Sequence, residues 1–367
     1  MKVIKIGGGC LKDGPAAKKI IRLIAERGEG DIFVLSAFYG VTDILISGIE
    51  AAMADELKIP PLISRLKDHH SDIVRYFIED SRDRDALAEE LAALFKKLER
   101  CYYGVSFTRE ATPRMMDMIA VFGEKISAVI LTRALAAMGR KSRMLLPEDA
   151  GIISDGKFTD ASAVMARTAD NLSAAVKEVM SDKTVLFVPG FYGVTESGDI
   201  TTFGRGGSDY SAAVVAASVD ADVLEIWKDT EGFMTADPDN IPHCRLIPEL
   251  TYEEAAELSY TGAGILHPRT VEPVKKAGID ITVKNTFSPD APGSRITKTA
   301  RQAESIVKSV SYTTDVSVLK IYAPDVGARF GILSLITETL ARGGINIKSV
   351  VTSQTSISIL LSRSDIE

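Results

Sequence analysis

Residues 1–37, MKVIKIGGGCLKDGPAAKKIIRLIAERGEGDIFVLSA, alternate between two kinds of pattern. Val3–Ile6 has the pattern of a short apolar strand, residues 15–27 have the period of a helix, and residues 31–37 form a second apolar strand. Strand, helix and strand in this order make a βαβ unit, whose two strands lie parallel in one sheet. The opening of the chain therefore predicts an α/β fold.

The segments that follow extend this pattern. Residues 44–137 are mostly helical in period, and residues 141–287 return to alternating strands and helices. The predicted strands are nearly continuous apolar runs such as IFVLS and TVLFVP, which is typical of a parallel sheet with helices on both faces. We expect further strands at residues 142–146, 185–189, 223–228 and 281–284.

A change of composition divides the chain. Residues 288–299, SPDAPGSRITKT, are rich in Pro, Gly, Ser and Thr and have no apolar period, which predicts a loop or linker. Beyond them the order is strand, helix, strand, strand. We therefore expect an α/β domain of residues 1–299 and a small, incomplete α+β domain of residues 300–367.

Composition limits the possible functions. The 367 residues are 46% hydrophobic and 25% charged, and no apolar run reaches the roughly 18 residues that a membrane span needs. The 50 acidic residues outnumber the 43 basic ones, which disfavours a nucleic-acid partner. The three separated cysteines predict neither disulfides nor a zinc site. The start lacks an export signal, so we expect a cytoplasmic protein with a small-molecule partner.

Gly7, Gly8 and Gly9 follow the first strand directly, behind Lys5. Without side chains, the backbone N–H groups of such a turn can approach an anion, and the next helix can point its N-terminus at it. The spacing fits neither G-x-G-x-x-G nor the P-loop pattern, so an ordinary turn stays an alternative.

A second glycine turn, TTFGRGGSDYSAA at residues 201–213, is more specific. Arg205 can hold a carboxylate through two parallel hydrogen bonds. We expect Ser208 to cap the helix that follows and to leave its positive end for an anion, while Asp209 orients a nearby cation or amine. The alternative is a surface turn in which Arg205 forms an ordinary salt bridge.

Two further strands end in polar residues, where the ligands of α/β sheets usually bind. After the strand of residues 31–37, SAFYGVTD contributes the hydroxyls of Ser36 and Thr42. The segment IWKDTEGFMTADP puts Lys228 and Asp229 at a strand end where a nucleotide can lie.

Six motifs occur in the order and approximate spacing of one family: KIGGG, SAFYGVTD, FGEKIS, TTFGRGGSDYSAA, DTEGFMTADP and GAGILHPRTVEP. With them the chain resembles the aspartate kinase branch of the amino-acid kinase family over almost its whole length. The resemblance implies a three-layer αβα sandwich around a mainly parallel sheet. It also implies transfer of the γ-phosphoryl group of ATP, with Mg²⁺, to the side-chain carboxylate of L-aspartate, the first step toward the amino acids made from aspartate.

The resemblance also implies roles for particular residues. Lys5, Gly7 and Gly8 would stabilise the phosphoryl group in transfer, with Asp209 as a further catalytic residue. The aspartate would be held by Ser36, Thr42, Glu124, Arg205, Gly206, Gly207 and Ser208, and the nucleotide by Lys228, Asp229, Met234, Asp237, Pro238 and Gly264. Because a carboxylate is ionised at neutral pH, transfer needs no base, and we expect His69, His70, His243 and His267 to be structural.

Several positions differ from the family pattern, mostly on the nucleotide side. They are Gly9 and Cys10 in place of Thr-Ser, Met234 in place of Tyr, Asp239 in place of Arg and Gly264 in place of Lys. Two cations are therefore lost. Lys228 replaces a Thr beside Asp229, and we predict that it supplies the missing positive charge over the nucleotide phosphates.

Residues 316–361 resemble the first βαββ of an ACT domain, a βαββαβ module that binds amino acids at paired interfaces. The resemblance implies feedback control by lysine or threonine, with contacts near residues 325–330 and Asn346, and an appendage that only stabilises a dimer is the alternative. An incomplete sheet exposes an apolar edge, so either the natural chain continues past Glu367 or another subunit covers it. We expect a homo-oligomer.

Two other functions stay open. The chain could be a regulatory subunit or pseudokinase that keeps the fold without turning over ATP, which the loss of two cations favours. Alternatively, it could be a kinase for another small acid.

Overall fold

The structure is a computed structural model of the whole chain, and it describes all residues except 181–182, 261–264, 301–306, 323–329 and 367. The chain divides into two compact units, Met1–Val310 and Ser311–Glu367. The predicted division after residue 299 remains a prediction, because residues 301–306 lie outside the described part.

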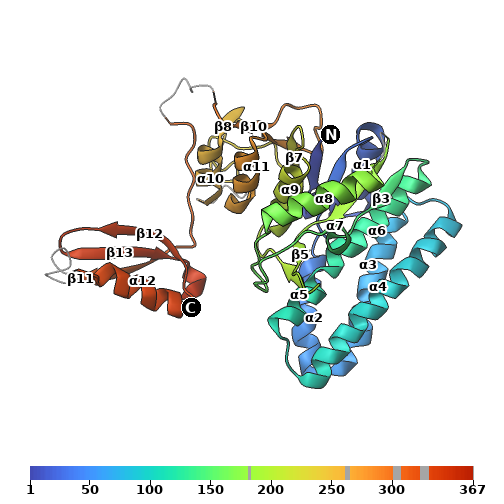
Figure 1. Cartoon of the computed structure of the whole chain (residues 1–367), viewed down its shortest axis with the longest axis horizontal. Coiled ribbons are helices and arrows are strands. Elements are labelled where there is room, and N and C mark those ends of the chain that lie inside the picture. The colour runs from blue at the N-terminus through green and yellow to red at the C-terminus, as the bar shows by residue number, and fades with distance from the viewer. Residues whose placement is uncertain (181–182, 261–264, 301–306, 323–329, 367) are drawn as a thin grey trace. The chain divides into compact units, whose positions relative to one another are not determined.

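The first unit is built on an eight-stranded sheet with the order β3-β4-β2-β1-β7-β9-β10-β8 (Figure 1). Its strands are β1 (Val3–Ile6), β2 (Ile32–Leu35), β3 (Ser142–Met144), β4 (Val185–Pro189), β7 (Leu224–Lys228), β8 (Glu249–Thr251), β9 (Ile281–Asn285) and β10 (Ser294–Thr297). Neighbours from β3 to β9 are parallel, β10 is antiparallel to β9, and β8 is parallel to β10. The predicted mainly parallel sheet is confirmed, including its opening βαβ unit.

Helices cover both faces of this sheet (Figure 1). They are α1 (Gly14–Arg27), α2 (Val41–Ala54), α3 (Ile59–Val74), α4 (Ser81–Thr108), α5 (Pro113–Ala120), α6 (Phe122–Ala137), α7 (Pro147–Ala150), α8 (Met165–Val179), α9 (Gly207–Ser218), α10 (Tyr252–Tyr260) and α11 (Val271–Ala277). Short 3-10 helices are η1 (Gly8–Leu11), η2 (Glu56–Lys58) and η3 (Pro268–Thr270). A small hairpin of β5 (Tyr192–Val194) and β6 (Ile200–Thr202) stands outside the main sheet.

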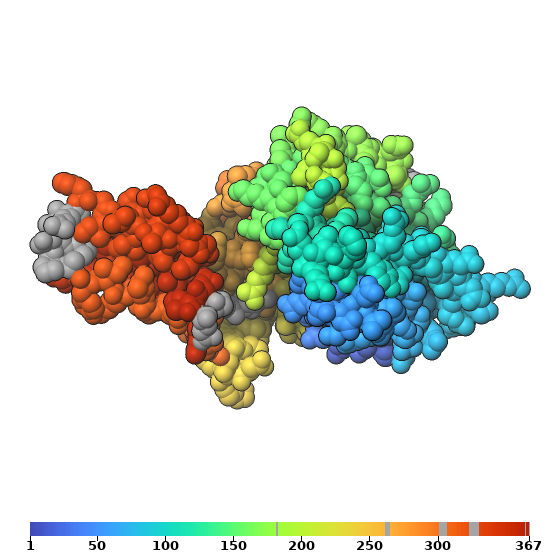
Figure 2. Space-filling model, turned by 90° about the horizontal axis from the view of Figure 1, so that it is seen from below, coloured from blue at the N-terminus to red at the C-terminus, as the bar shows by residue number. Residues whose placement is uncertain are grey.

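Alternation along the strands divides the interior into two cores. Ile4 and Ile6 of β1 pack with α1 to α6, whereas Val3 and the β2 residues Ile32 and Val34 pack with α8 to α11. Successive side chains of a strand point to opposite faces, so an apolar strand with helices on both sides forms a three-layer αβα sandwich. In the space-filling view, the blue and cyan segments of the chain lie directly against the green segments that follow (Figure 2).

The prediction of a linker at residues 288–299 is wrong in part, because Ser294–Thr297 forms β10. Ser294 is fully buried, and its hydroxyl donates to the Ile247 carbonyl and accepts from the Phe233 amide. Gly293, with φ +69°, lets the chain turn back to pair with β9. The polar composition of the segment obscured a short alternation of buried and outward residues. Pairing with β8 and β9 makes this segment a strand.

The second unit contains β11 (Ser317–Tyr322), α12 (Ile332–Arg342), β12 (Ile347–Thr352), β13 (Ser356–Leu361) and a final 3-10 turn, η4 (Arg363–Asp365). Its antiparallel sheet has the order β11-β13-β12, and Leu340 of α12 packs on Ile357, Ile359 and Leu361. The predicted order of strand, helix, strand and strand is confirmed. Asn346 is exposed, and of residues 325–330 only Phe330 lies within the described part. No helix in the described ranges is long and apolar enough to cross a membrane.

Candidate active site

The two glycine turns predicted from the sequence meet at a buried ion pair. The Lys5 ammonium lies 2.6 Å from Asp209 Oδ1, and both side chains are about nine-tenths buried. Lys5 is in β1, directly before the first turn, and Asp209 is in the first turn of α9, directly after the Arg205 turn. Because β1, β2 and β7 pair in register at Ile6, these groups lie beyond a shared edge of the sheet.

A second ammonium approaches the same carboxylate. Lys228 ends β7, and its Nζ lies 3.9 Å from Asp209 Oδ2. Burial alone would raise the pKa of Asp209, but the charges of Lys5 and Lys228 hold that pKa below its ordinary value. Burial and repulsion from Lys5 lower the pKa of Lys228, while Asp209 opposes this change. Asp209 is therefore an anion that gathers two cations at one point.

The first glycine turn is closely packed at Gly8 and Gly9. A Cβ on Gly8 would lie 3.2 Å from the Ala37 carbonyl oxygen, and one on Gly9 would lie 3.0 Å from the Asp229 carboxylate. The Gly7 amide donates to the Trp227 carbonyl. The turn therefore links the ends of β1, β2 and β7, and it brings the predicted residues Gly7, Gly8 and Asp229 together.

The second turn holds Arg205 between two glycines in left-handed conformation, Gly204 with φ +69° and Gly206 with φ +71°. Arg205 is exposed and forms no ion pair with any residue of the described part. The prediction that Ser208 caps α9 is wrong: Gly206 is the N-cap, α9 begins at Gly207, and no side chain caps it. The left-handed Gly206 takes the N-cap position two residues before Ser208, so Ser208 lies within the first turn of the helix.

The remaining predicted acceptor residues lie beside these turns. A Cβ on Gly190, after β4, would be 3.1 Å from Ser208 Cβ and 3.0 Å from the Leu35 carbonyl oxygen, so the ends of β2 and β4 meet α9. Ser127 donates its hydroxyl hydrogen to the Ser36 carbonyl at 2.8 Å. Thr42 lies half-buried in the first turn of α2.

Glu124, in the first turn of α6, has an unusual environment. Its side chain is buried, and Oε2 has no hydrogen-bond partner among the described residues. Burial raises the pKa of Glu124 to about 8, although the Ala37 amide and the charge of Lys5 oppose this rise. A buried carboxyl with an unused oxygen can accept a cationic ligand at the cost of losing its proton.

The predicted nucleotide residues are more scattered. Met234 is half-buried, and its carbonyl accepts a hydrogen bond from Ser309. Asp237 and Pro238 are exposed in a turn where the Asp237 carboxylate accepts from the Asp239 amide and the Asn240 side chain. Gly264 lies outside the described part of the chain.

The sequence analysis missed two residues near the Arg205 turn, the buried Asp117 and the partly exposed Arg269. Asp117 of α5 accepts hydrogen bonds from the Thr202 amide and hydroxyl, and Arg269 of η3 donates to the Phe203 carbonyl. A carboxylate within the otherwise apolar run MMDMIAVF was the available signal for Asp117. Arg269 lies inside the motif GAGILHPRTVEP, but nothing in the motif indicates which backbone it binds.

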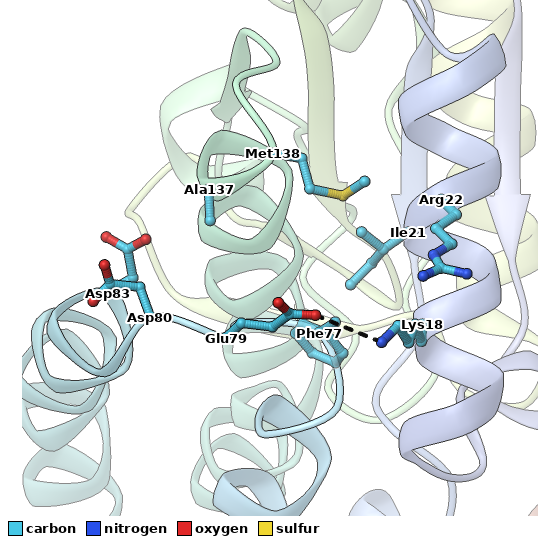
Figure 3. A pocket seen from close by; sticks show the side chains of 9 residues that line it. All are labelled: Lys18, Ile21, Arg22, Phe77, Glu79, Asp80, Asp83, Ala137 and Met138. Carbon is cyan, nitrogen blue, oxygen red and sulfur yellow. Dashed lines mark ion pairs between the residues drawn. The ribbon is translucent and has the colours of Figure 1, made fainter.

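Two other features of the first unit, a buried histidine and a surface cavity, have no proposed part in the site. His70 is buried, with Nδ1 2.6 Å from the Leu66 carbonyl oxygen, and burial lowers its pKa to about 4. A cavity of about 360 Å³ is lined by Lys18, Ile21, Arg22, Phe77, Glu79, Asp80, Asp83, Ala137 and Met138 (Figure 3). Within it Lys18 lies 4.0 Å from Glu79. None of the predicted site residues lines it, and we assign it no role.

Known proteins with similar sequences are aspartokinases. Aspartokinase 1, chloroplastic, of Arabidopsis thaliana is 30% identical over 361 residues, which cover 98% of this chain and 63% of that protein. Aspartokinase 2, chloroplastic, of the same plant is 31% identical over 366 residues, 98% of this chain and 66% of that protein. The chain thus spans somewhat less than two thirds of the length of these relatives.

Solved structures and the family profile agree with this likeness. Escherichia coli aspartokinase III in complex with aspartate and ADP has a TM-score of 0.86 at 23% identity, covering 100% of this chain and 79% of that one. Aspartate kinase of Clostridium acetobutylicum has a TM-score of 0.75 at 25% identity, with the same coverage of 100% and 79%. Residues 1–285 match the profile of the amino acid kinase family. The chain therefore belongs to the amino acid kinase family.

Proposed function

We propose that this chain is an aspartate kinase, which transfers the γ-phosphoryl group of ATP to the side-chain carboxylate of L-aspartate and releases ADP and 4-phospho-L-aspartate. The observation that carries the proposal is the meeting of the two glycine turns at the Lys5–Asp209 ion pair, 2.6 Å long. A phosphate-binding turn and a carboxylate-binding turn that share one buried contact bring donor and acceptor together, which is the main requirement of phosphoryl transfer.

On the phosphate side, Lys5 and the amides of the first turn would stabilise the charge on the phosphoryl oxygens. The close packing of Gly8 and Gly9 leaves backbone rather than side chains at this point, as an anion-binding turn requires. Asp209 would orient Lys5 toward the phosphoryl group. Mg²⁺, bound to the oxygens of ATP, supplies further positive charge when the nucleotide binds.

On the acceptor side, Arg205 would hold the α-carboxylate of aspartate, because its guanidinium is exposed and has no carboxylate partner in the described residues. Glu124 would accept the α-ammonium group with its unused Oε2. Ser36, Thr42, Gly206, Gly207 and Ser208 complete the proposed acceptor site. The two charged groups match the two charges of an amino acid backbone, which leaves the side-chain carboxylate for the phosphoryl group.

On the nucleotide side, we propose that Lys228 and Asp229 lie against the phosphates, with Met234, Asp237, Pro238 and Gly264 further along the nucleotide. The proximity of Lys228 to Asp209 supports this reading for Lys228, because a cation beside Lys5 replaces positive charge lost elsewhere. The pseudokinase alternative drew on that lost charge, and Lys228 weakens it.

The second unit is proposed to be the first part of an ACT domain that senses an amino acid, lysine or threonine, in a cytoplasmic homo-oligomer. A structure of E. coli aspartokinase III in complex with lysine and aspartate has a TM-score of 0.82 with this chain at 23% identity. The likeness of fold and the order β11, α12, β12, β13 support this proposal.

The function is tested by ADP release with Mg-ATP and a panel of aspartate, glutamate, N-acetylglutamate and UMP, with hydroxylamine present to trap an acyl phosphate. We expect hydroxamate only with aspartate. Hydroxamate with another acid would assign a different acceptor. Binding of ADP without turnover of any acceptor would identify a pseudokinase.

A further inference from the structure

The acceptor-binding residue proposed above lies in a turn whose backbone packs closely on neighbouring segments: an added Cβ would lie 2.3 Å from His267 Cβ at Gly206 and 2.9 Å from the Thr159 carbonyl oxygen at Gly204. Arg205 is exposed, and the glycines on either side have no side chains that could fix the backbone. The only hydrogen bond that the described part shows across this turn runs from the Gly207 amide to the Gly204 carbonyl. The neighbouring segments on which the turn packs therefore help to determine where the guanidinium lies.

Asp117 holds the residue that leads into this turn. Its Oδ1 accepts the Thr202 hydroxyl at 2.6 Å, and its Oδ2 accepts the Thr202 amide at 3.0 Å and the Thr159 amide at 2.8 Å. Only 2% of Asp117 is exposed, and no ion pair to it is found within the described ranges. A carboxylate buried without a cation is costly unless neutral donors satisfy it, so the three bonds keep this backbone in place.

Arg269 holds the next residue of the chain. Its Nη1 donates to the Phe203 carbonyl at 2.9 Å and to Asp160 Oδ1 at 2.7 Å. Its Nη2 donates to the Ala161 carbonyl at 2.5 Å and to the Ser162 hydroxyl at 3.0 Å. The guanidinium also lies 4.8 Å from the ring centre of Tyr210, next to Asp209. A planar fork of donors suits such a fixed set of acceptors, and lysine cannot copy it.

The two side chains grip the same two pieces of backbone. Asp117 binds Thr159 and Thr202, whereas Arg269 binds residues 160–162 and Phe203. They come from α5 and η3, elements far apart in sequence, and together they tie residues 159–162 to residues 202–203. Most of the polar atoms of both side chains are used in these bonds. Their arrangement suits a role in holding backbone rather than in binding a ligand.

We propose that Asp117 and Arg269 are positioning residues that fix the Arg205 turn so that its guanidinium meets the acid acceptor. The inference rests on the proposed function in one respect, the assignment of Arg205 to the acceptor. It predicts that weakening either side chain reduces acceptor affinity through Arg205 and leaves nucleotide affinity unchanged.

The test uses Asp117→Asn and Arg269→Lys, each alone and combined with Arg205→Ala. Aspartate affinity is measured by calorimetry in the presence of Mg-ADP, so that it does not depend on turnover. ADP affinity is measured from the fluorescence of Trp227, the single tryptophan of the chain. We expect each single variant to bind aspartate roughly 10-fold to 100-fold more weakly, with ADP affinity within about twofold of the wild type.

Combination with Arg205→Ala separates positioning from general structure. If Asp117 and Arg269 act through Arg205, each adds little to the loss already caused by Arg205→Ala, because coupled residues are not additive. Full additivity, or an equal loss of ADP affinity, would overturn the proposal. Melting temperatures of all variants identify any that fail to fold, and the conclusion then rests on the other residue.

Matched controls repeat the same chemistry away from the turn. Asp31 is 9% exposed and accepts a hydrogen bond from the Lys2 amide near the start of β1. Arg295, in β10, donates two hydrogen bonds to Asp280. Asp31→Asn and Arg295→Lys should leave aspartate affinity unchanged. A wild type that binds ADP but no aspartate would refute the proposed function. Normal aspartate binding by both Asp117→Asn and Arg269→Lys would refute only the positioning role.

Discussion

Glu124 gives the sharpest expectation for a single residue. Burial raises the pKa of Glu124 to about 8, so the carboxyl is largely protonated at neutral pH and must lose its proton to pair with an ammonium group. We therefore expect the KM for aspartate to fall as the pH rises from about 6.5 to about 9, by at most about tenfold per pH unit. In Glu124→Gln the KM should be high and nearly independent of pH. A wild-type KM that does not change over this range would contradict the proposed contact.

The same pKa affects the stability of the free protein. A carboxyl whose pKa is raised on folding stabilises the protein fully below its unfolded pKa, and this contribution is lost as the pH rises through the folded value of about 8. As the pH rises from about 4.5 to about 8, the melting temperature of the wild type should therefore fall more steeply than that of Glu124→Gln. Parallel curves would show that the buried carboxyl does not titrate there.

Lys228 is expected to act on the nucleotide. Its ammonium shares Asp209 with Lys5, so its removal reduces the positive charge at the proposed phosphate site. Losing one well-placed charge stabiliser costs on the order of 10² to 10³ in rate, and we expect Lys228→Ala to lower kcat toward this range and to raise the KM for ATP. Lys228→Arg, which keeps the charge, is the control. If Lys228→Ala left both constants unchanged, its role at the phosphates would be abandoned.

Among the elements, α9 depends on the way it begins. Gly206 has φ +71°, and a Cβ there would lie 2.3 Å from His267 Cβ. An alanine would therefore add a collision to the roughly 1–2 kcal/mol that left-handed backbone costs a residue with a Cβ. We expect Gly206→Ala to lower the free energy of unfolding by more than this amount and to weaken aspartate binding, because α9 and the Arg205 turn must shift.

Gly278 offers the matched control for this element. It ends α11 with φ +72°, but nothing lies within 4 Å of an added Cβ. Gly278→Ala should lose only the backbone cost and bind aspartate normally. Equal stability losses in both variants, measured by urea unfolding, would show that His267 simply moves aside.

At the scale of the whole molecule, the two units have separate cores. No residue of the core around Leu340 belongs to the cores of the first unit. The last residues of the first unit nevertheless contact the proposed nucleotide residue Met234 and its surroundings. Lys308 lies 2.7 Å from Glu254, Ser309 donates to the Met234 carbonyl, and the Val310 amide donates to the Thr235 carbonyl. A shortened chain that keeps these contacts must therefore include Val310, the last residue of the first unit.

We expect a chain that ends at Val310 to unfold cooperatively and to bind ADP as tightly as the full chain. A chain that ends at residue 299 lacks the three contacts just described, and its ADP affinity should fall. Both are measured by thermal unfolding and by Trp227 fluorescence. Equal ADP binding by the two shortened chains would support the division after residue 299 that the composition suggests.

The sequence by itself determined much of the fold, because periodicity is a local property of the chain. Apolar runs identified β1, β2, β4, β7 and β9, and the two glycine turns stood out by composition. The order of elements in the second unit was also readable. The sequence therefore predicted which segments form the proposed site, and at which end of each strand they lie.

Tertiary structure alone decided how these segments meet. The contact of Lys5 with Asp209 joins residues far apart in the sequence of the first unit. The hydrogen bonds of Asp117 and Arg269 likewise bring four separate segments of the chain together. No local pattern records such contacts, because they depend on the path of the chain between them. The same reason explains the two errors: neighbouring strands make residues 294–297 a strand, and the left-handed Gly206, closely packed against His267, takes the cap position from Ser208.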